Sequence, residues 1–386
     1  MANLKAAVIG TGFIGPAHIE ALRRIPEVDV EAVASVNINS AKSAAKQYSI
    51  PKAYASWEEV VNDKNVQVIH NCTPNNLHFE INNAAMQAGK HIISEKPLTM
   101  TSKESAELVN LAKKTNLVNA INFNYRFYPL TQHARSMVKS GELGDIYLIH
   151  GNYLQDWLYY ETDYNWRLES SISGKSRAVA DIGSHWCDLV QFITGQKIKR
   201  VFADLITIHE KRKRPLEQVS TFKGKEEKPT FNNEDIKIDT EDAGIVMLQF
   251  SGGAHGVFTV SQVSAGRKNH FTLEIDGSKK ALYWNQESPN ELWIGHREKA
   301  NEIVIKDPSL LNEDVRSYAH YPGGHPEGYP DGLKNLFINV YEFIRQGKNP
   351  DTDKKDFPTF IDGHYENLVV EAVLKSSNEH KWIDVG

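Results

Sequence analysis

The sequence predicts two domains: an α/β domain built on a doubly wound parallel sheet, followed by an α+β domain with a mostly antiparallel sheet. Three observations support this prediction. The chain has 386 residues, more than one compact core usually holds. Its first part alternates apolar runs with helix-like segments. After Tyr125 the apolar runs are short and partly alternating, with glycine-rich turns between them. We therefore place the first domain over residues 1–124 and the second over 125–386.

The first domain reads as a regular succession of strands and helices. Helix-like stretches cover Asn76–Gly89 and Ser102–Thr115. Five apolar runs are expected to be strands: Ala6–Gly10, Val28–Ser35, Val66–Thr73, Lys90–Lys96 and Leu117–Phe123. Strands that alternate with helices through short links are typical of a parallel, doubly wound sheet.

The second domain begins with a helix expected at Leu130–Lys139 and closes with helices near Gly332–Arg345 and Gly363–Ser376. Between them, four runs are expected to form an antiparallel sheet: Gly244–Phe250, Ala254–Val263, His270–Asp276 and Lys280–Trp284. The run Glu210–Pro229 mixes charges of both signs. We interpret it as a solvated loop, with a basic docking site as the less favoured alternative.

Composition excludes several classes of protein. The net charge of −5 provides no basic field for a nucleic acid. The chain has no apolar run close to the roughly 20 residues that cross a bilayer, and its N-terminus lacks the pattern of a signal peptide. The two cysteines, Cys72 and Cys187, make no disulfide framework. We expect a cytoplasmic protein.

A glycine loop follows the first strand and indicates a dinucleotide. Gly10, Gly12 and Gly15 have GxGxxG spacing, and Phe13 and Ile14 complete the loop. The first glycine permits a tight turn, the second lets the backbone approach a pyrophosphate, and the third lets the helix pack on the strand. The positive end of that helix then faces the anion. The sequence therefore predicts a Rossmann domain that binds NAD or NADP.

The choice between the two cofactors stays open at Ser35, which ends the second strand. A carboxylate at this position would hold the adenosine ribose and favour NAD. Its absence leaves room for a 2′-phosphate, yet no arginine follows and the nearest cation is Lys42.

The segment Ala178–Asp188 reads as a buried helix that carries an Asp–His pair. Asp181 and His185 lie four residues apart, on one face of a helix. A histidine has a pKa suited to proton transfer, and a carboxylate one turn away can orient it. A histidine satisfied within the core is the plain alternative. An Asp–His pair can also ligate zinc, but His209 and His255 lie in unrelated segments, so we expect no metal.

Several motifs together resemble one family. The glycine loop, "NCTPNNLHFE", "SEKPLTM", "DIGSH" and the late "FPTFIDGHYENLVVEAVLKSS" resemble the Gfo/Idh/MocA oxidoreductases, the glucose–fructose oxidoreductase and inositol dehydrogenase group. The resemblance covers essentially the whole chain. It implies an N-terminal domain that carries NAD(P) and a C-terminal domain whose large open sheet often builds dimers or tetramers.

The resemblance also implies roles for individual residues. Lys96 matches the catalytic lysine, Asp181 and His185 match the other two catalytic residues, and the Lys96–Pro97 bond is often cis in relatives. Positions that match cofactor contacts are Thr73, Pro74, Asn75, His78, Glu95 (near the nicotinamide ribose), Lys96, Asn122, Trp166 and Arg167, in addition to Gly10, Gly12, Phe13, Ile14, Gly15 and Ser35. The sequence leaves open whether Lys96 or His185 accepts the proton.

Aromatic and polar residues in the second domain suit a carbohydrate. Residues 152–167 concentrate aromatic rings with acidic groups, and rings pack on the C–H faces of sugars. A role in the core or in a subunit interface is the alternative for these rings. We expect substrate contacts from Tyr125, Arg126, Asp156, Trp157 and, in the loop "YPGGHPEGYPD", His325.

The prediction is an NAD(P)-dependent oxidoreductase that acts on a secondary alcohol or ketone of a sugar, sugar derivative or cyclitol. Lys96 or His185 would remove the hydroxyl proton, and Asp181 would orient the pair. Two alternatives remain: an enzyme that cleaves glycosides through transient oxidation, and a regulator that binds the dinucleotide without turnover. We expect a homodimer or homotetramer, with no nucleic acid and no membrane as partner.

Overall fold

The computed structural model describes residues 2–216 and 232–386, which form two compact units. The first unit comprises residues 2–122 and 333–367. The second comprises residues 123–216, 232–332 and 368–386. The chain therefore leaves the first unit after residue 122 and contributes to it again near its end.

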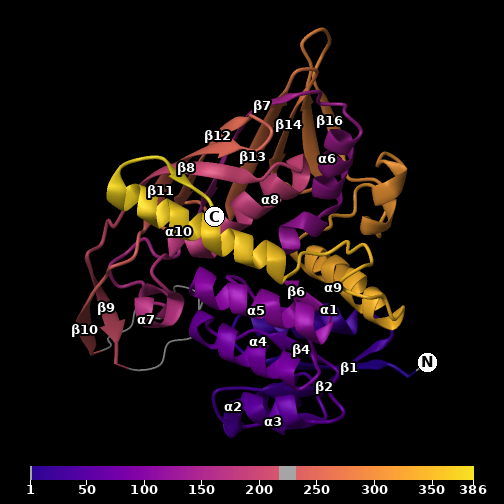
Figure 1. Ribbon diagram of the computed structural model, residues 1–386, viewed down its shortest axis with the longest axis vertical. Helices are drawn as coiled ribbons and strands as arrows, with labels where there is room; N and C mark the ends of the chain where they lie inside the picture. The colour runs from indigo at the N-terminus through magenta and orange to yellow at the C-terminus, as the bar shows by residue number, and fades with distance from the viewer. Residues whose placement is uncertain (1, 217–231) are drawn as a thin grey trace. The chain divides into compact units, whose positions relative to one another are not determined.

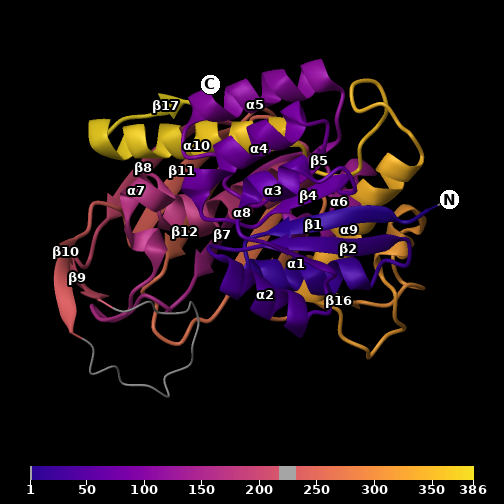
Figure 2. The same cartoon turned by 90° about the horizontal axis from the view of Figure 1, so that it is seen from below.

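The first unit is built on a six-stranded parallel sheet with the order β3-β2-β1-β4-β5-β6. This order is that of the doubly wound fold, and the prediction of a parallel sheet is confirmed. Figure 2 shows β1 and β2 side by side. The strands are β1 (Leu4–Ile9), β2 (Val28–Ala34), β3 (Lys52–Tyr54), β4 (Val68–Asn71), β5 (His91–Ser94) and β6 (Asn119–Ile121).

Helices connect these strands, and their starts are fixed by local caps. The Asn37 side chain accepts a hydrogen bond from the Ser40 amide at 2.9 Å at the start of α2, and Thr101 and Glu104 form a capping box on α5. The helices of the first unit are α1 (Ile14–Arg23), α2 (Ile38–Gln47), α3 (Trp57–Asn62), α4 (His78–Gln87) and α5 (Ser102–Thr115), joined by parts of α9 (Tyr329–Arg345) and α10 (Phe360–Glu379).

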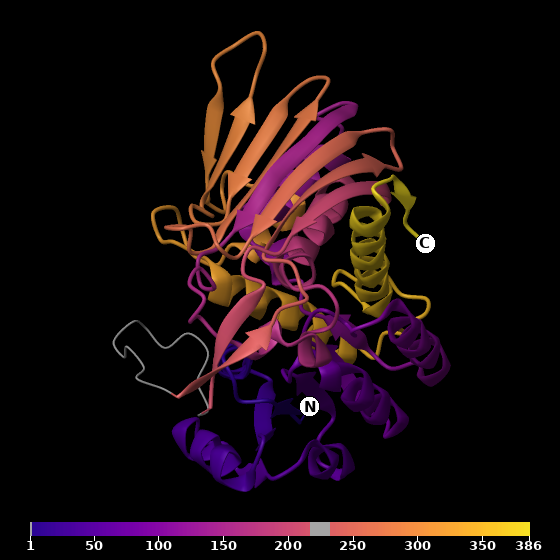
Figure 3. The same cartoon turned by 90° about the vertical axis from the view of Figure 1, so that its left-hand side faces the viewer.

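The second unit is built on a nine-stranded sheet with the order β16-β15-β14-β13-β7-β12-β11-β8-β17 (Figure 3). Its neighbours are antiparallel except for β7 and β12, so the predicted, mostly antiparallel sheet is confirmed. The strands are β7 (Ile146–Leu154), β8 (Ile198–Ile206), β11 (Ala243–Phe250), β12 (His255–Ser261), β13 (His270–Gly277), β14 (Ala281–Asn285), β15 (Glu291–Gly295), β16 (Glu302–Ile305) and β17 (Ile383–Asp384).

One face of this sheet forms the core of the second unit, where α6 (Pro129–Lys139) and α8 (Ser184–Thr194) lie (Figure 1). Trp186 of α8 stacks on Phe258 with ring centroids 4.7 Å apart, and its Nε1 donates to the Thr272 carbonyl at 3.0 Å. Leu248 of β11 is fully buried, whereas its neighbour Met247 is 42% exposed. This alternation leaves the opposite face of the sheet open.

The run Glu210–Pro229 is not a solvated loop throughout, and that prediction is wrong for its first residues. Lys211–Pro215 form strand β9, which pairs antiparallel with β10 (Asn233–Lys237). The guanidinium of Arg212 is buried and lies 2.7 Å from Asp242 Oδ1. A buried ion pair anchors this hairpin at Arg212, whereas Lys211 on the same strand is exposed. Residues 217–229 of the run lie outside the described residues.

The hydrophobicity of the helices and the state of the cysteines can also be described. None of the helices in the described ranges combines the length and hydrophobicity that a bilayer-spanning segment needs. Cys72 and Cys187 are both buried, and neither takes part in a disulfide.

Candidate active site

The glycine loop connects β1 to α1, and only one of its three glycines has free space beside its Cα. Gly10 has φ +100°, and a Cβ there would lie 2.4 Å from the Cys72 carbonyl oxygen. A Cβ on Gly15 would lie 2.0 Å from the Gly10 carbonyl oxygen. A Cβ on Gly12 would meet nothing within 4 Å. Gly10 and Gly15 thus pack the turn, while the free space at Gly12 fits the approach of a dinucleotide backbone.

The residues next to this loop are partly exposed and leave room for a ligand. Phe13 is 58% exposed and Ile14 begins α1, so the loop presents a largely exposed aromatic side chain next to the helix N-terminus. Ser35 Oγ lies 2.6 Å from Thr11 Oγ1, which ties the end of β2 to the loop. Val36 follows and is 83% exposed. The position after β2 is therefore open and carries no charge.

His78 fastens the segment 73–75 to the segment around Lys96. Its Nε2 lies 2.9 Å from the Thr73 carbonyl oxygen, and its Nδ1 lies 2.7 Å from the Pro97 carbonyl oxygen. The ring is fully buried, and burial lowers the pKa of His78. Pro74 precedes the 3₁₀ turn Asn75–Leu77. The Lys96–Pro97 peptide is cis, as the resemblance implies. His78 therefore shapes the site through backbone contacts.

Glu95 is a buried carboxylate surrounded by donors. His18 Nε2 lies 2.9 Å from Glu95 Oε1, Asn122 Nδ2 donates to the same oxygen, and the Lys96 amide donates to Oε2 at 3.3 Å. Burial alone would raise the pKa of Glu95, but the hydrogen bonds from His18 and Asn122 and the charge of Lys96 lower it to about 2. Glu95 is thus ionised next to the half-buried Lys96.

In the second unit, Asp181 and His185 lie where a π-helical turn, Val179–Gly183, runs into α8. Such π-turns inside helices frequently occur at functional sites. Arg167 Nε lies 3.2 Å from Asp181 Oδ1, and Gln262 Nε2 donates to Oδ2 at 3.0 Å. Arg167 also covers the ring of Trp166 at 4.4 Å. The structure brings three predicted residues together here, Trp166, Arg167 and Asp181.

The imidazole of His185 lies among aromatic rings. The ring of Tyr125 meets it edge-on with centroids 4.9 Å apart, and Phe123 lies at 5.8 Å. Tyr125 Oη lies 2.8 Å from Tyr153 Oη and accepts from Asn269 Nδ2 at 3.1 Å. Burial raises the pKa of Tyr125, which keeps the phenol protonated. The structure thus places the predicted substrate residue Tyr125 beside the predicted catalytic His185.

Three polar partners in this region, Tyr153, Asn269 and Gln262, were not singled out by the sequence analysis. Tyr153 Oη donates to Asn269 Oδ1 at 2.6 Å, and Gln262 holds Asp181. Their signal in the sequence is weak because each lies at the end of a strand or just beyond it. Their side chains are linked to predicted site residues only in the folded protein, which the sequence does not reveal.

Four other predicted substrate residues have well-defined surroundings. Arg126 Nε donates to Asp188 Oδ2 at 2.8 Å, and its guanidinium also lies over Phe192. Asp156 Oδ2 accepts from Lys268 Nζ at 2.6 Å. Trp157 Nε1 donates to Gln155 and its ring packs on a small core with Leu158, Leu168 and Ile238. His325 is exposed, and its Nδ1 lies 3.3 Å from the Gly323 carbonyl oxygen.

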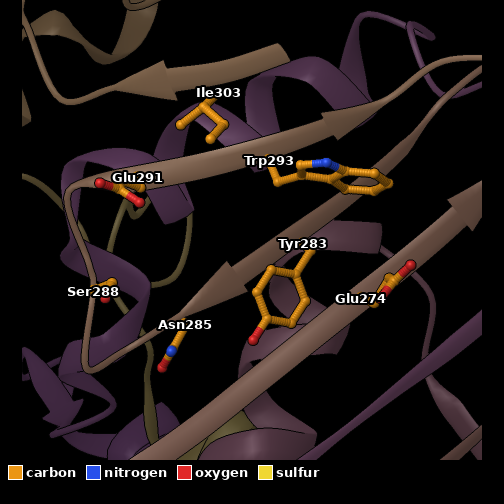
Figure 4. Close-up of a pocket in the computed structure, with 7 residues that line it drawn as sticks. All are labelled: Glu274, Tyr283, Asn285, Ser288, Glu291, Trp293 and Ile303. Carbon is orange, nitrogen blue, oxygen red and sulfur yellow. The ribbon is translucent and has the colours of Figure 1, made fainter. Parts of the chain in front are cut away.

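A separate pocket lies on the open face of the second unit's sheet, formed by β13 to β16 (Figure 4). None of the predicted site residues lines it. The lining residues are Glu274, Tyr283, Asn285, Ser288, Glu291, Trp293 and Ile303. On the same face, among the described residues, His150, Glu274 and Asp276 have ligand atoms within 4.8 Å of one another. These groups are half-exposed, and they lie outside the predicted catalytic set.

The glycine loop and the ionised Glu95 in the first unit, and the Asp–His pair in the second, are features expected of a nucleotide-dependent oxidoreductase. Comparison with known families agrees. A family model described as an oxidoreductase family with an NAD-binding Rossmann fold matches residues 4–123, and a GFO/IDH/MocA C-terminal domain model matches residues 131–283. The protein belongs to the Gfo/Idh/MocA family of oxidoreductases, and its first unit is an NAD-binding Rossmann domain.

Individual relatives span the entire chain. The protein is 28% identical to levoglucosan dehydrogenase of Pseudarthrobacter phenanthrenivorans, over 100% of this chain and 99% of the relative. A solved structure of levoglucosan dehydrogenase in complex with NADH and L-sorbose superposes with a TM-score of 0.89 at 28% identity, with both chains covered completely. An oxidoreductase domain protein from Kribbella flavida is 30% identical, with a TM-score of 0.88 over both entire chains.

Proposed function

We propose that this protein is an NAD-dependent dehydrogenase that interconverts a secondary alcohol and a ketone on a sugar, sugar derivative or cyclitol. The observation that carries the proposal is the pair Asp181 and His185 at the π-turn, with Asp181 held by Arg167 and Gln262. A carboxylate fixed by two donors and an imidazole one turn later are groups suited to moving a hydroxyl proton.

The residues proposed to hold the cofactor follow from the loop and from the family match. The open space at Gly12 and the exposed Phe13 support pyrophosphate and adenine contacts. The bound cofactor would supply the hydride acceptor, and the protein would supply its position. The proposed contacts are Gly10, Gly12, Phe13, Ile14, Gly15, Ser35, Thr73, Pro74, Asn75, His78, Glu95, Lys96, Asn122, Trp166 and Arg167.

The proposed acid–base groups are Lys96 and His185, with Asp181 as the orienting group. His185 is buried among rings, so its proton would exchange with a bound hydroxyl in a site poor in water. The charge of Lys96 in turn helps to lower the pKa of the neighbouring Glu95. The proposed substrate contacts are Tyr125, Arg126, Asp156, Trp157 and His325.

A spectrophotometric screen at the NADH absorbance tests the proposal. It would combine sugars and cyclitols, including levoglucosan and L-sorbose, with NAD and with NADP. We expect turnover with NAD, and a loss of at least about 100-fold in Lys96→Ala and His185→Ala. NADH binding, measured by calorimetry, should survive in both variants.

The matched control is His255→Ala, an exposed histidine at the start of β12, which should retain full activity. Turnover close to that of the unmodified protein in both Lys96→Ala and His185→Ala would overturn the assignment. Cleavage of a glycoside without net formation of NADH would favour the transient-oxidation alternative. NADH binding without turnover on any polyol would favour the regulator.

We also propose that the protein forms a homodimer or homotetramer and works in the cytoplasm. The open face of the large sheet exposes Ile245 (48%) and Met247 (42%), apolar surface typical of an interface. The two thiols without a disulfide suit a reducing compartment. Light scattering on Met247→Glu should show smaller particles, whereas Leu310→Glu, in an exposed loop, should not. A monomeric unmodified protein would contradict the oligomer.

A further inference from the structure

A chain of four hydrogen-bonded side chains runs through the first unit and ends at Glu95. Glu95 Oε1 lies 2.9 Å from His18 Nε2. The other nitrogen of that ring, His18 Nδ1, lies 2.9 Å from His70 Nδ1. His70 Nε2 lies 2.9 Å from Tyr341 Oη. Glu95 directly follows β5, the other three groups come from α1, β4 and α9, and all four belong to the first unit.

When each imidazole carries one proton, the chemistry of these groups fixes the direction of every hydrogen bond. The ionised carboxylate of Glu95 can only accept, so His18 must carry its proton on Nε2. A neutral His18 then accepts at Nδ1, and His70 must donate from its own Nδ1. This leaves His70 Nε2 as an acceptor, and the hydroxyl of Tyr341 donates to it. The two histidines are therefore held in opposite tautomers.

These four side chains, Glu95, His18, His70 and Tyr341, form a column that is isolated from water. His18 and His70 are 0% exposed and Tyr341 is 1% exposed. The ring of Phe337, one helical turn before Tyr341, packs edge-on against both imidazoles with centroids 4.9 and 4.8 Å away. Burial, together with the neighbouring His18, lowers the pKa of His70 well below its ordinary value. Burial thus favours the neutral form of His70.

We propose that His18, His70 and Tyr341 are positioning residues that lock Glu95 as an ionised acceptor for the NAD cofactor. The inference rests on the proposed function in one respect, namely that Glu95 contacts the cofactor. His18 and Asn122 occupy Oε1, so the column holds the carboxylate in a single orientation with Oε2 toward the Lys96 amide. Tyr341 acts through two other side chains and touches neither the cofactor nor the substrate.

Removal of the Tyr341 hydroxyl would release this lock. Without this hydroxyl, no donor faces His70 Nε2, and nothing favours the tautomer in which that nitrogen lacks a proton. The tautomer of His70 with its proton on Nε2 then becomes accessible. In that tautomer His70 Nδ1 is an acceptor, so two acceptor nitrogens face each other unless His18 moves its proton to Nδ1. A neutral His18 with its proton on Nδ1 no longer donates to Glu95.

Nitrogen NMR of the protein labelled with ¹⁵N-histidine tests the column directly, without cofactor or substrate. We expect one proton on each ring, at Nε2 of His18 and at Nδ1 of His70. The chain has 15 histidines, so His18→Gln and His70→Gln identify the two sets of signals. Identical tautomers for His18 and His70 in the unmodified protein would overturn the proposal even if no variant folds.

Tyr341→Phe provides the functional arm. It should mix the tautomers of both histidines and raise the Kd for NADH by about tenfold, the usual effect of removing a supporting hydrogen bond behind a ligand. The control is Tyr54→Phe, which removes a hydroxyl that donates to Asp63 at 2.9 Å elsewhere in the first unit. This control should change neither the tautomers nor the Kd.

The two proposals fail in different ways. If the unmodified protein does not bind NADH, the proposed function fails, while the NMR result still decides whether the column exists. If the unmodified protein binds NADH and Tyr341→Phe binds it equally well, with unchanged tautomers, the positioning role of Tyr341 is wrong and the dehydrogenase assignment is untouched.

Discussion

Arg167 Nε lies 3.2 Å from Asp181 Oδ1, which joins a proposed cofactor contact to a proposed catalytic carboxylate. The other oxygen of Asp181 accepts from Gln262, so each carboxylate oxygen has a donor. The carboxylate is thereby held in one orientation, and its charge is partly balanced by a guanidinium that stacks on Trp166.

This arrangement predicts that charge at Asp181 matters more than its shape. Asp181→Asn keeps the size of the side chain and removes the charge, so we expect kcat to fall by about 100-fold or more while the Kd for NADH changes little. Initial rates and calorimetry measure the two quantities. Asp235→Asn, which neutralises an exposed carboxylate paired with Lys213 on β9, serves as the comparison and should lose far less. Equal losses in the two variants would argue against an active-site role for Asp181.

The three loop glycines should respond differently to the same added methyl group. Gly10→Ala and Gly15→Ala push a Cβ into backbone atoms, so each should lower the free energy of unfolding by about 2 kcal/mol or more. Gly12→Ala meets empty space and should fold with unchanged stability, yet raise the Kd for NADH by at least about tenfold. Thermal melts and NADH titrations measure both effects. Normal cofactor binding by Gly12→Ala would mean that the free space is not where the dinucleotide lies.

The exposed, uncharged position after β2 predicts how the cofactor preference can be changed. An arginine in place of Val36 would supply the cation that a 2′-phosphate requires. Val36→Arg should therefore raise affinity for NADPH relative to NADH by about tenfold. Val36→Gln has similar length without the charge and should leave the ratio unchanged. An unaltered ratio in Val36→Arg would show that the 2′ position lies elsewhere.

The buried His70 predicts a loss of stability in mild acid. Burial lowers its pKa in the folded protein below the value of 6.5 in the unfolded chain, so the unfolded state binds more protons as the pH falls. Its stabilising contribution is complete above that value and is lost as the pH falls below it, at up to about 1.4 kcal/mol per pH unit. Glu95, with a pKa lowered from 4.5 to about 2, loses its contribution only below pH 4.5.

Urea denaturation at pH 7 and pH 5.5 measures this effect. His70→Asn should show a smaller decrease between the two values than the unmodified protein does, whereas the exposed His255→Asn should show the same decrease. His78, His91 and His133 also have lowered pKa values, so part of the dependence will remain in His70→Asn. A dependence that His70→Asn leaves unchanged would mean that His70 does not titrate in this range.

Local patterns in the sequence were enough to predict much of the fold. Five strands of the parallel sheet and the helices α4 and α5 were predicted because each buries apolar residues with its own period, and α5 has the predicted bounds Ser102–Thr115. Strand β3, at Lys52–Tyr54, was not predicted because three half-buried residues carry no periodicity. Strand β9 was hidden by charge, since the burial of Arg212 depends on Asp242, 30 residues further along the chain.

The candidate site likewise has parts that local sequence predicts and parts that depend on long-range contacts. Gly10, Gly12 and Gly15 could be predicted because their conformation and spacing are local requirements. The π-turn at Val179–Gly183 and the hold of Gln262 on Asp181 depend on packing between distant segments, which no window of sequence contains. The change of texture after Tyr125 is likewise local, whereas the contribution of residues 333–367 to the first unit depends on long-range contacts.

That late contribution has a consequence for how the nucleotide domain can be inherited or engineered. A fragment that ends at residue 122 would keep the glycine loop and Glu95 but would leave His70 without the Tyr341 hydroxyl and both imidazoles without the cover of Phe337. Residues 1–122 alone therefore do not contain the complete interior of the Rossmann domain. A chimera that exchanges C-terminal halves between relatives also exchanges part of the interior of the nucleotide domain. A transplanted nucleotide domain must therefore include residues 333–367 as well.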